Sequence, residues 1–436
     1  MNTPFKTFYF DGYSFNPETK TLLLRYFLDD SVEFTETFIF DFAFSPSYNA
    51  TILDNAFQGL FIAAGISYFK THIPREIRFR TNQISAAQKK FFEKLYLFGL
   101  GEFFYRNDID PNGKINFMPS GDMMTPFLLP ALDLKGSLVS LSGGKDSLVA
   151  GEILKSQGVD FETWTLGEYP FIVGIASKMG KTHSAVKRIL SPNLAQLNGA
   201  GALNGHIPIS SIIAFVGVCA AILKGKKNVI VAEGTSSREQ NTVFKGIPIN
   251  HQYSKTLAFE KDFQKYVHSF ISPSIDYFSF VRPLSELRIA EMLCTRFFED
   301  YKDNFSSCND NFRITNKSEK MSWCGKCPKC ASTFALFSPF LPREQLIHLF
   351  GGKNLFADPK LVTTYRELLG ISGVKPFGCV GEIMEIRTAI LLARETKNYP
   401  ELNDMTFEKP DFDWREFGEH SMPEHFAGIL KLFLNK

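Results

Sequence analysis

The stretch SGGKDS, residues 142–147, combines the side chains and the backbone freedom that phosphate binding requires. Adjacent glycines let backbone N–H groups approach an oxyanion, and the positive end of a following helix attracts the same charge. The hydroxyl groups of Ser142 and Ser147 can donate hydrogen bonds, and the ammonium group of Lys145 can donate a hydrogen bond to a phosphate. Asp146 suits a role in orienting the loop or holding Mg²⁺. Because Asp146 follows the lysine where a Walker P-loop has Ser or Thr, the motif predicts another kind of phosphate loop, and a glycine turn without ligand is the alternative.

A second group of reactive residues lies in WCGKCPKC, which contains Cys324, Cys327 and Cys330. Two residues separate neighbouring cysteines, so two thiolates of each turn can reach one Zn²⁺. Cys308 is the best candidate for the fourth ligand, and His348 is the weaker one. Four thiolates leave no open position for water or substrate, so the pattern predicts structural zinc. A reducing compartment favours metal binding over disulfides here.

Strands and helices alternate around the glycine loop. A buried strand at 138–141 precedes it, and a helix at 147–156 follows it. The later segments are a strand at 161–166, a helix at 210–223, strands at 229–232 and 277–281, and a helix from the Ser285 cap to about residue 298. This alternation predicts a mostly parallel sheet covered on both faces, with ligands at the carboxyl ends of its strands.

The flanking segments have different patterns. The first forty residues predict β-hairpins, followed by helices at about 50–69 and, behind a Ser85 cap, 85–99. Helical segments are expected near 359–369, 381–394 and 420–433. We therefore predict an N-terminal α+β domain at 1–134, a nucleotide-binding domain at 135–300, and a zinc-binding, mainly helical region at 301–436.

Composition limits the possible classes of protein. The 436 residues include 48 basic and 46 acidic side chains, so no broad basic field favours nucleic acid. The 45 phenylalanines indicate well-filled cores. No apolar run approaches the roughly 20 residues of a membrane span, and the start has no signal-type pattern. A soluble, cytoplasmic protein is expected.

The loop SGGKDS resembles that of the PP-loop ATP pyrophosphatases, also called the N-type family. In that family the loop grips the pyrophosphate end of ATP, and a substrate oxygen attacks the α-phosphate. The resemblance covers about residues 135–300 and implies the PP-loop parallel sheet with helices on both faces. It also implies that EGTSSREQN, which includes Glu233 and Gly234, faces the nucleotide, and that VRPLSEL closes another corner of the site.

One cysteine followed by C-x-x-C-x-x-C also resembles the zinc site of PP-loop enzymes that make the deazapurine precursor of queuosine. An adenylating enzyme of nucleobase or tRNA modification is therefore an alternative function. A nucleotide-binding protein without catalysis is a second alternative.

Several segments together are similar to the UDP-N-acetylmuramoyl-L-alanyl-L-glutamate epimerases of bacterial cell-wall synthesis. They include LYLFGLGEFFYRNDID, NGHIPISSIIAF, VAEGTSSREQN, YFSFVRPLSEL, WCGKCPKC and KPFGCVGE, and they run from about residue 60 to 385. The resemblance implies a small-molecule substrate, the UDP-activated muramoyl dipeptide, whose terminal L-Glu becomes D-Glu. It further implies ATP and Mg²⁺ as cofactors, with AMP and pyrophosphate released, in peptidoglycan precursor synthesis.

Epimerisation needs a proton removed from one face of a carbon and returned to the other, by two opposed groups or by one that moves. The acid–base candidates are His206, His251, Glu233, Lys255 and Cys379. Each histidine is alternatively a hydrogen-bonded loop residue or one that positions substrate. Cys379 is either a thiolate base, as in ATP-independent glutamate racemases, or a buried inert thiol.

The implied substrate carries a diphosphate and a γ-carboxylate, so it requires cations. The candidates lie in or beside the matching segments: Arg106, Arg238, Lys245, Arg282 and Arg288. Arginine suits bidentate contact with a carboxylate. Ordinary salt bridges are the alternative role for each of them.

Overall fold

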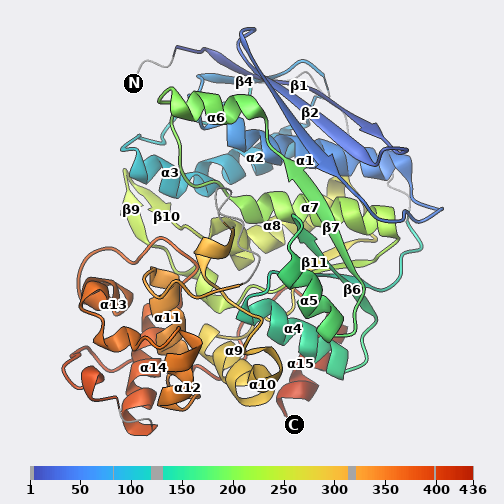
Figure 1. The fold of residues 1–436 in the computed structure, drawn as a ribbon. Coiled ribbons are helices and arrows are strands. Elements are labelled where there is room, and N and C mark those ends of the chain that lie inside the picture. The colour runs from blue at the N-terminus through green and yellow to red at the C-terminus, as the bar shows by residue number, and fades with distance from the viewer. Residues whose placement is uncertain (1–3, 82, 119–130, 313–320, 397–398, 436) are drawn as a thin grey trace.

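The computed structural model describes residues 4–81, 83–118, 131–312, 321–396 and 399–435 (Figure 1). One nine-stranded sheet runs through it in the order β11-β8-β5-β6-β7-β3-β2-β1-β4. Its strands are β1 (Thr7–Asn16), β2 (Thr21–Leu28), β3 (Val32–Ile39), β4 (Glu76–Phe79), β5 (Ser137–Ser140), β6 (Phe161–Leu166), β7 (His183–Ile189), β8 (Asn228–Val231) and β11 (Asp276–Ser279). A separate hairpin pairs β9 (Thr242–Phe244) with β10 (Ile247–Ile249).

The sheet has a parallel part and an antiparallel part. Strands β11, β8, β5, β6 and β7 pair in parallel. Strands β1, β2 and β3 form the predicted antiparallel hairpins, and β4 pairs in parallel with β1. The two parts join where β3 runs antiparallel to β7, so one sheet crosses residue 134, where we predicted a boundary between domains. The α/β class, with a large, mostly parallel sheet, is confirmed.

The helices lie on both faces of this sheet and beyond its edge. In the first part of the chain they are α1 (Ala50–Phe69), α2 (Ala86–Gly99), α3 (Gly101–Arg106), α4 (Lys145–Ser156), α5 (Pro170–Lys178), α6 (Pro192–Gly199), α7 (Ile209–Lys224) and α8 (Leu257–Phe270). The later ones are α9 (Glu286–Met292), α10 (Phe298–Tyr301), α11 (Pro328–Phe337), α12 (Arg343–Leu349), α13 (Val362–Leu368), α14 (Ile383–Thr396) and α15 (Glu424–Leu434). Figure 1 shows α11 to α14 grouped together, away from the N-terminal strands.

Strand β5 separates two hydrophobic cores. Successive side chains of a strand point to opposite faces, and Leu138 belongs to the core that contains α1 and α7, whereas Val139 belongs to the core that contains α4 and α11. On the first face the helices pack so closely that a Cβ on Gly59 of α1 would clash with the ring of Phe215 on α7. The glycine loop therefore follows a strand whose two faces are both packed in hydrophobic cores.

Most predicted elements are present. Helix α1 and strand β6 have the predicted bounds, and Ser85 begins α2 with a reciprocal capping box. The sequence analysis did not predict β7, α5, α6, α8 or α11. Within the described residues, no helix has both the length and the apolar character needed to cross a membrane.

Candidate active site

The glycine loop connects β5 to the start of α4. Gly143 has a φ of +73°, a left-handed conformation that favours glycine. The loop is closed by side chains at its two ends, because Ser147 Oγ accepts a hydrogen bond from the Ser142 backbone N–H at 3.2 Å and lies 3.1 Å from Ser142 Oγ. The turn that the sequence predicted is therefore formed, directly before a helix N-terminus.

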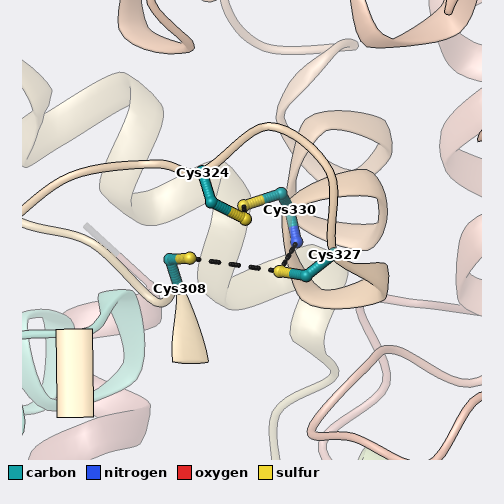
Figure 2. Close-up of side chains that lie close together, drawn as sticks. All are labelled: Cys308, Cys324, Cys327 and Cys330. Carbon is teal, nitrogen blue, oxygen red and sulfur yellow. Dashed lines mark hydrogen bonds between the residues drawn. The ribbon is translucent and has the colours of Figure 1, made fainter. Parts of the chain in front are cut away.

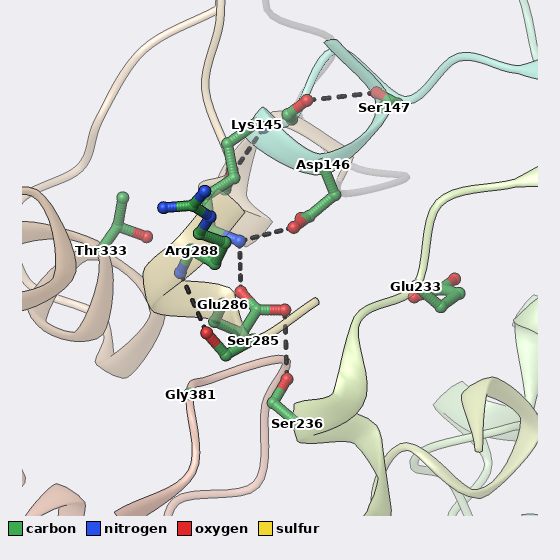
Figure 3. Close-up of polar contacts among 12 residues, drawn as sticks. Lys145, Asp146, Ser147, Glu233, Ser236, Ser285, Glu286, Arg288, Thr333 and Gly381 are labelled. Carbon is green, nitrogen blue, oxygen red and sulfur yellow. Dashed lines mark hydrogen bonds and ion pairs between the residues drawn. The ribbon is translucent and has the colours of Figure 1, made fainter. Parts of the chain in front are cut away.

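Lys145 is fully buried, and two carboxylates neutralise it (Figure 3). Its Nζ lies 2.6 Å from Asp146 Oδ1 and also pairs with Glu286 Oε2 of α9. Burial alone would lower the pKa of Lys145, but Asp146 and Glu286 outweigh it and raise that pKa. Burial opposes ionisation of Glu286 as well, yet Lys145 lowers the pKa of Glu286 to about 2. Both partners of this buried pair are therefore charged.

The two segments expected to surround the nucleotide meet at this pair. Ser236, in the 3-10 turn Thr235–Arg238 after β8, donates to Glu286 Oε1 at 3.1 Å. The backbone N–H of Glu286 donates to Glu385 Oε1 at 2.7 Å, which links α9 to α14. Figure 3 shows Glu233 across from Asp146, on the strand-end loop that leads to Ser236.

A C-terminal segment covers the glycine loop. The backbone N–H of Ser306 donates to the Gly143 carbonyl at 3.1 Å, and the Lys145 N–H donates to Ser307 Oγ at 3.4 Å. A Cβ on Gly143 would lie 2.9 Å from the terminal carbon of Met321. The residues just before Cys308 thus lie over the turn that we predicted to bind phosphate.

The four cysteines Cys308, Cys324, Cys327 and Cys330 converge on one point (Figure 2). Cys308 Sγ lies 4.0 Å from Cys327 Sγ, and Cys324 Sγ lies 3.7 Å from Cys330 Sγ. A tetrahedral ion with bonds of about 2.3 Å places its sulfur ligands about 3.8 Å apart, so this set fits zinc. Cys308, rather than His348, completes the predicted set, and a Cys₄ cluster that can hold a metal ion is confirmed.

Lys255, Glu233 and Cys379 form a second charged cluster near the loop. Lys255 Nζ lies 3.2 Å from Glu233 Oε2. Burial would lower the pKa of Lys255, but Cys379 and Glu233, followed by Asp146, raise it. Burial would raise the pKa of the Cys379 thiol, but Lys255 and His251 lower it to about 6. These charges therefore favour the thiolate form of Cys379.

Two histidines share one carboxylate beside this cluster. His251 Nδ1 is hydrogen-bonded to Glu102 Oε2, and His206 Nδ1 lies 3.6 Å from the same oxygen. The two imidazole rings are 4.3 Å apart between centroids. Burial opposes protonation of both, but Cys379 and Glu102 raise the pKa of His251 to about 9, whereas that of His206 falls to about 3. One ring is cationic and the other is neutral.

The structure thus places all the acid–base candidates in one region, next to the glycine loop. Sequence reasoning missed Glu102, which lies 149 residues before His251 in the chain. The only signal for it in the sequence is its place in GLGEFFYRNDID, part of a segment that resembles the epimerase family. Glu102, His206 and His251 also have ligand atoms near enough to hold an ion.

The five predicted substrate cations have different environments. Arg282 is buried and donates to Glu260, to the Gly234 carbonyl and to Ser237 Oγ, so it holds the loop after β8. Arg238 makes a bidentate pair with Glu382, at 2.7 and 3.1 Å.

The other three cations lie at the surface or near it. Arg288 pairs with Glu291 on the same helix. Arg106 lies 3.3 Å from Glu102 and has its guanidinium carbon 4.7 Å from the centre of the Phe377 ring, two residues before Cys379. Lys245 is exposed, with a φ of +50° in the β9–β10 turn. Arg106 thus pairs with the same carboxylate as the two histidines.

The mostly parallel sheet, the glycine turn between a strand and a helix and the four-cysteine cluster define an α/β protein with a site that can hold a metal ion. The chain belongs to the MurL family: the model of the MurL N-terminal domain matches residues 1–280, and that of the MurL C-terminal domain matches residues 304–411.

Similar proteins cover nearly the whole chain. A UDP-N-acetyl-alpha-D-muramoyl-L-alanyl-L-glutamate epimerase of Xanthomonas oryzae pv. oryzae is 36% identical over 91% of this chain and 87% of its own length. Epimerases of the same name from a Micromonospora species and from Salinispora tropica are 32% and 33% identical, over 97% and 94% of this chain and 97% and 90% of their own lengths.

Proposed function

We propose that this protein epimerises the terminal L-Glu of UDP-MurNAc-L-Ala-L-Glu to D-Glu through an acyl-adenylate, with release of AMP and pyrophosphate. The observation that carries this proposal is the identity of 32–36% to proteins named as this epimerase, over most of both chains. The reaction belongs to the synthesis of peptidoglycan precursors in the cytoplasm.

ATP is needed because a carboxylate holds its α-hydrogen tightly. Removing that hydrogen would place a second negative charge beside the first, and each unit of pKa in this difficulty corresponds to about 1.36 kcal/mol. Conversion of the carboxylate into a mixed anhydride with AMP cancels the first charge. The α-carbanion is then stabilised as an enolate, which is reprotonated on the other face before hydrolysis releases the epimer.

The residues of the glycine loop are the proposed nucleotide site. Ser142, Gly143, Gly144, Lys145 and Ser147 lie at the strand end and helix N-terminus where a phosphate chain is favoured. Asp146 is the proposed partner of Mg²⁺, and Glu233 and Gly234 form the facing side. The cover formed by Ser306 and Ser307 has to move for the phosphates to reach the Lys145 backbone N–H, because Ser307 Oγ accepts that hydrogen bond.

The remaining residues have distinct proposed roles. His206, His251, Glu233, Lys255 and Cys379 are the acid–base candidates. Arg106 and Lys245 are the proposed contacts for the anionic substrate, because both are exposed and, unlike Arg238, neither makes a bidentate ion pair among the described residues. Zinc in the Cys₄ cluster has a structural role.

An adenylating enzyme of nucleobase or tRNA modification is not favoured. The relatives named above carry the epimerase name, and a balance of 48 basic to 46 acidic residues supplies no broad field for RNA.

Chiral analysis of glutamate tests the proposal directly. The purified protein is incubated with UDP-MurNAc-L-Ala-L-Glu, ATP and Mg²⁺, and the hydrolysed product is resolved into L- and D-Glu. D-Glu should appear only when ATP is present. Recovery of L-Glu alone, from protein that binds ATP, would refute the proposal.

Exchange between ATP and labelled pyrophosphate identifies the substrate class. Dependence of exchange on the muramoyl dipeptide supports the epimerase, and dependence on RNA or a deazapurine supports the alternative. Nucleotide binding without any exchange would indicate a protein that binds ATP without catalysis.

A further inference from the structure

The segment that carries Cys379 is held against the loop that carries His251 and against α3. Asn241 Nδ2 donates to the carbonyls of Lys375 and Pro376, at 3.1 and 3.0 Å, while Asn241 Oδ1 accepts the backbone N–H of His251 at 2.9 Å. On the other side the ring of Phe377 lies 5.3 Å from that of Tyr105 on α3. Three parts of the chain that are distant in sequence are thus fixed together.

Three side chains at this junction, Glu102, His251 and Cys379, form a line in which His251 contacts both of the others. Glu102 of α3 accepts from Nδ1 of His251, and His251 in turn interacts with the Cys379 sulfur. A carboxylate that binds one ring nitrogen sets the orientation and tautomer of the imidazole, so that the other nitrogen stabilises a partner at the far end. This line is the arrangement by which known cysteine nucleophiles and bases are kept as thiolates.

We propose that Cys379 removes the α-hydrogen of the activated glutamate, and that Glu102 and His251 position it and keep it in the reactive form. This inference rests on the proposed function. Cys379 would be the catalytic residue, while Glu102 and His251 would be positioning residues. No motif in the sequence assigns Glu102 to the reaction.

The step balances without an added reagent. The S–H bond forms as the Cα–H bond breaks, and the electron pair of that bond moves onto the carbonyl oxygen of the mixed anhydride. The opposite face then receives a proton from a second acid, for which the Lys255 ammonium, paired with Glu233, is positioned nearby. Proton transfer from the Cys379 thiol to the neutral Lys255 amine through solvent restores both groups.

Several charged groups around Glu102, His251 and Cys379 affect the protonation of the Cys379 thiol and the His251 imidazole. Lys255 and His251 act on Cys379 from the same connection between β10 and α8, and Lys329 acts from α11. Burial raises the pKa of Glu233, and the charge of Cys379 raises it further. His206 packs on His251 and is neutral, so it adds no second positive charge. The Glu102 carboxylate is the anion that faces the imidazolium from α3.

The first experiment separates proton transfer from adenylation. In Cys379→Ser and Cys379→Ala, exchange between pyrophosphate and ATP in the presence of the dipeptide should persist. Formation of D-Glu, and incorporation of solvent deuterium at Cα in D₂O, should fall by about 10²–10⁴-fold. Cys219→Ala, which alters a buried cysteine of α7, is the matched control and should keep both activities.

The outcomes are distinguishable. Loss of D-Glu together with retained exchange supports the role of Cys379 as the base. Deuterium incorporation near the wild-type rate in Cys379→Ser would overturn it while leaving the epimerase function intact. Absence of D-Glu from the wild-type protein would instead refute the proposed function.

Glu102→Gln tests the positioning role in protein that circular dichroism shows to be folded, because unfolding would also return the Cys379 thiol to its usual pKa. The rate at which iodoacetamide alkylates Cys379 is followed against pH by peptide mapping. Without the carboxylate the imidazolium is less stable, so the apparent pKa of the thiol should rise from about 6 towards its usual value. The acid limb of the epimerisation rate should move to higher pH with it.

Metal analysis tests whether Glu102, His206 and His251 bind a metal ion instead. If the wild-type protein held a second ion besides zinc, and Glu102→Gln removed it, Glu102, His206 and His251 would be metal ligands. That result would overturn the positioning role of Glu102 and His251. An unchanged pH dependence of alkylation in Glu102→Gln would overturn it equally.

Discussion

At the scale of single residues, the environment of Lys145 links burial to chemistry. A buried ammonium requires partners, and Asp146 and Glu286 approach it from two different helices. The loop lysine is therefore held in one position by these two carboxylates.

Asp146→Ala should abolish pyrophosphate release, with a loss of at least about 10²–10³-fold. The substitution removes the proposed Mg²⁺ contact and one of the two anions at Lys145. Continuous measurement of pyrophosphate with the dipeptide and ATP checks this. Asp133→Ala changes an exposed aspartate before β5 and should release pyrophosphate normally. Normal release in Asp146→Ala would contradict the role given to the loop.

Glu286→Gln should destabilise the fold by about 3 kcal/mol, because it leaves a buried lysine with one anion instead of two. The folded pKa of Glu286, about 2, lies below its ordinary value of 4.5. Its contribution is therefore present above about pH 4.5 and is lost as the pH falls towards 2. Urea unfolding at pH 7 and pH 3 should show a difference between the variant and wild type that shrinks at the lower pH.

The control for this measurement is Glu299→Gln. Glu299 pairs with Lys302 in an exposed position, at 2.7 Å, and surface pairs add little to stability. Its unfolding midpoint should match wild type at both pH values. An equal loss in the two variants would show that burial of the Lys145 pair has no special effect.

Residue types and spacing were enough to predict the glycine loop and the cysteine set. Their chemistry is local, because six consecutive residues form one and a short C-x-x-C-x-x-C run forms most of the other. Glu102 could not be found in this way. A single glutamate in a short helix has no distinguishing pattern, and its role depends on a contact with His251 that only the tertiary fold creates.

At the scale of elements, hydrophobic periodicity predicted the helices and strands whose apolar side chains are packed in the cores. Helix α1 and strand β6 carry consistent apolar patterns, and their bounds were predicted correctly. Strand β7 was missed because HSAVKRI is only half buried and contains basic residues, and its place depends on pairing with β6 and β3. Helix α8 was missed although Thr256 caps it and Phe259, Phe263 and Val267 follow a helical spacing.

Removal of zinc should loosen the cover over the glycine loop, because Cys308 directly follows Ser306 and Ser307. In Cys308→Ser, bound zinc should fall below that of wild type. Hydrogen exchange should accelerate at the amides of Ser306 and Lys145, which bond across this contact. Metal analysis and exchange mass spectrometry are the measurements. Cys219→Ala, outside the cluster, should keep its zinc. Zinc loss without faster exchange would separate the metal site from the loop.

At the scale of the whole molecule, the first hydrophobic core crosses the boundary predicted at residue 134. It joins Phe8 and Tyr26 of the N-terminal strands to Phe215 of α7 and Phe263 of α8. The division of the chain into three regions remains a prediction from sequence patterns. A shared core and a shared sheet are the reasons to test whether these regions fold separately.

A fragment of residues 1–134 should fail to fold cooperatively, because it would expose the edge of β3 and the face of α1 that contacts α7. Full-length protein should instead unfold residues 1–280 in one calorimetric transition. Circular dichroism of the fragment during heating is the simplest measurement. A sharp melting transition for residues 1–134 alone would support an independent N-terminal domain.

The antiparallel pairing of β3 with β7 also restricts how reactants can enter. Backbone hydrogen bonds across Thr37, Phe38 and Ile39 tie the amino-terminal strands rigidly to the parallel strands, so these two parts cannot swing apart like jaws. In the proposed function, nucleotide therefore enters by displacement of the segment that carries Ser306 and Ser307, which is attached to the glycine loop by a few hydrogen bonds. A crosslink between the segment that carries Ser306 and Ser307 and α4 should therefore retain nucleotide that is already bound and prevent nucleotide in solution from binding.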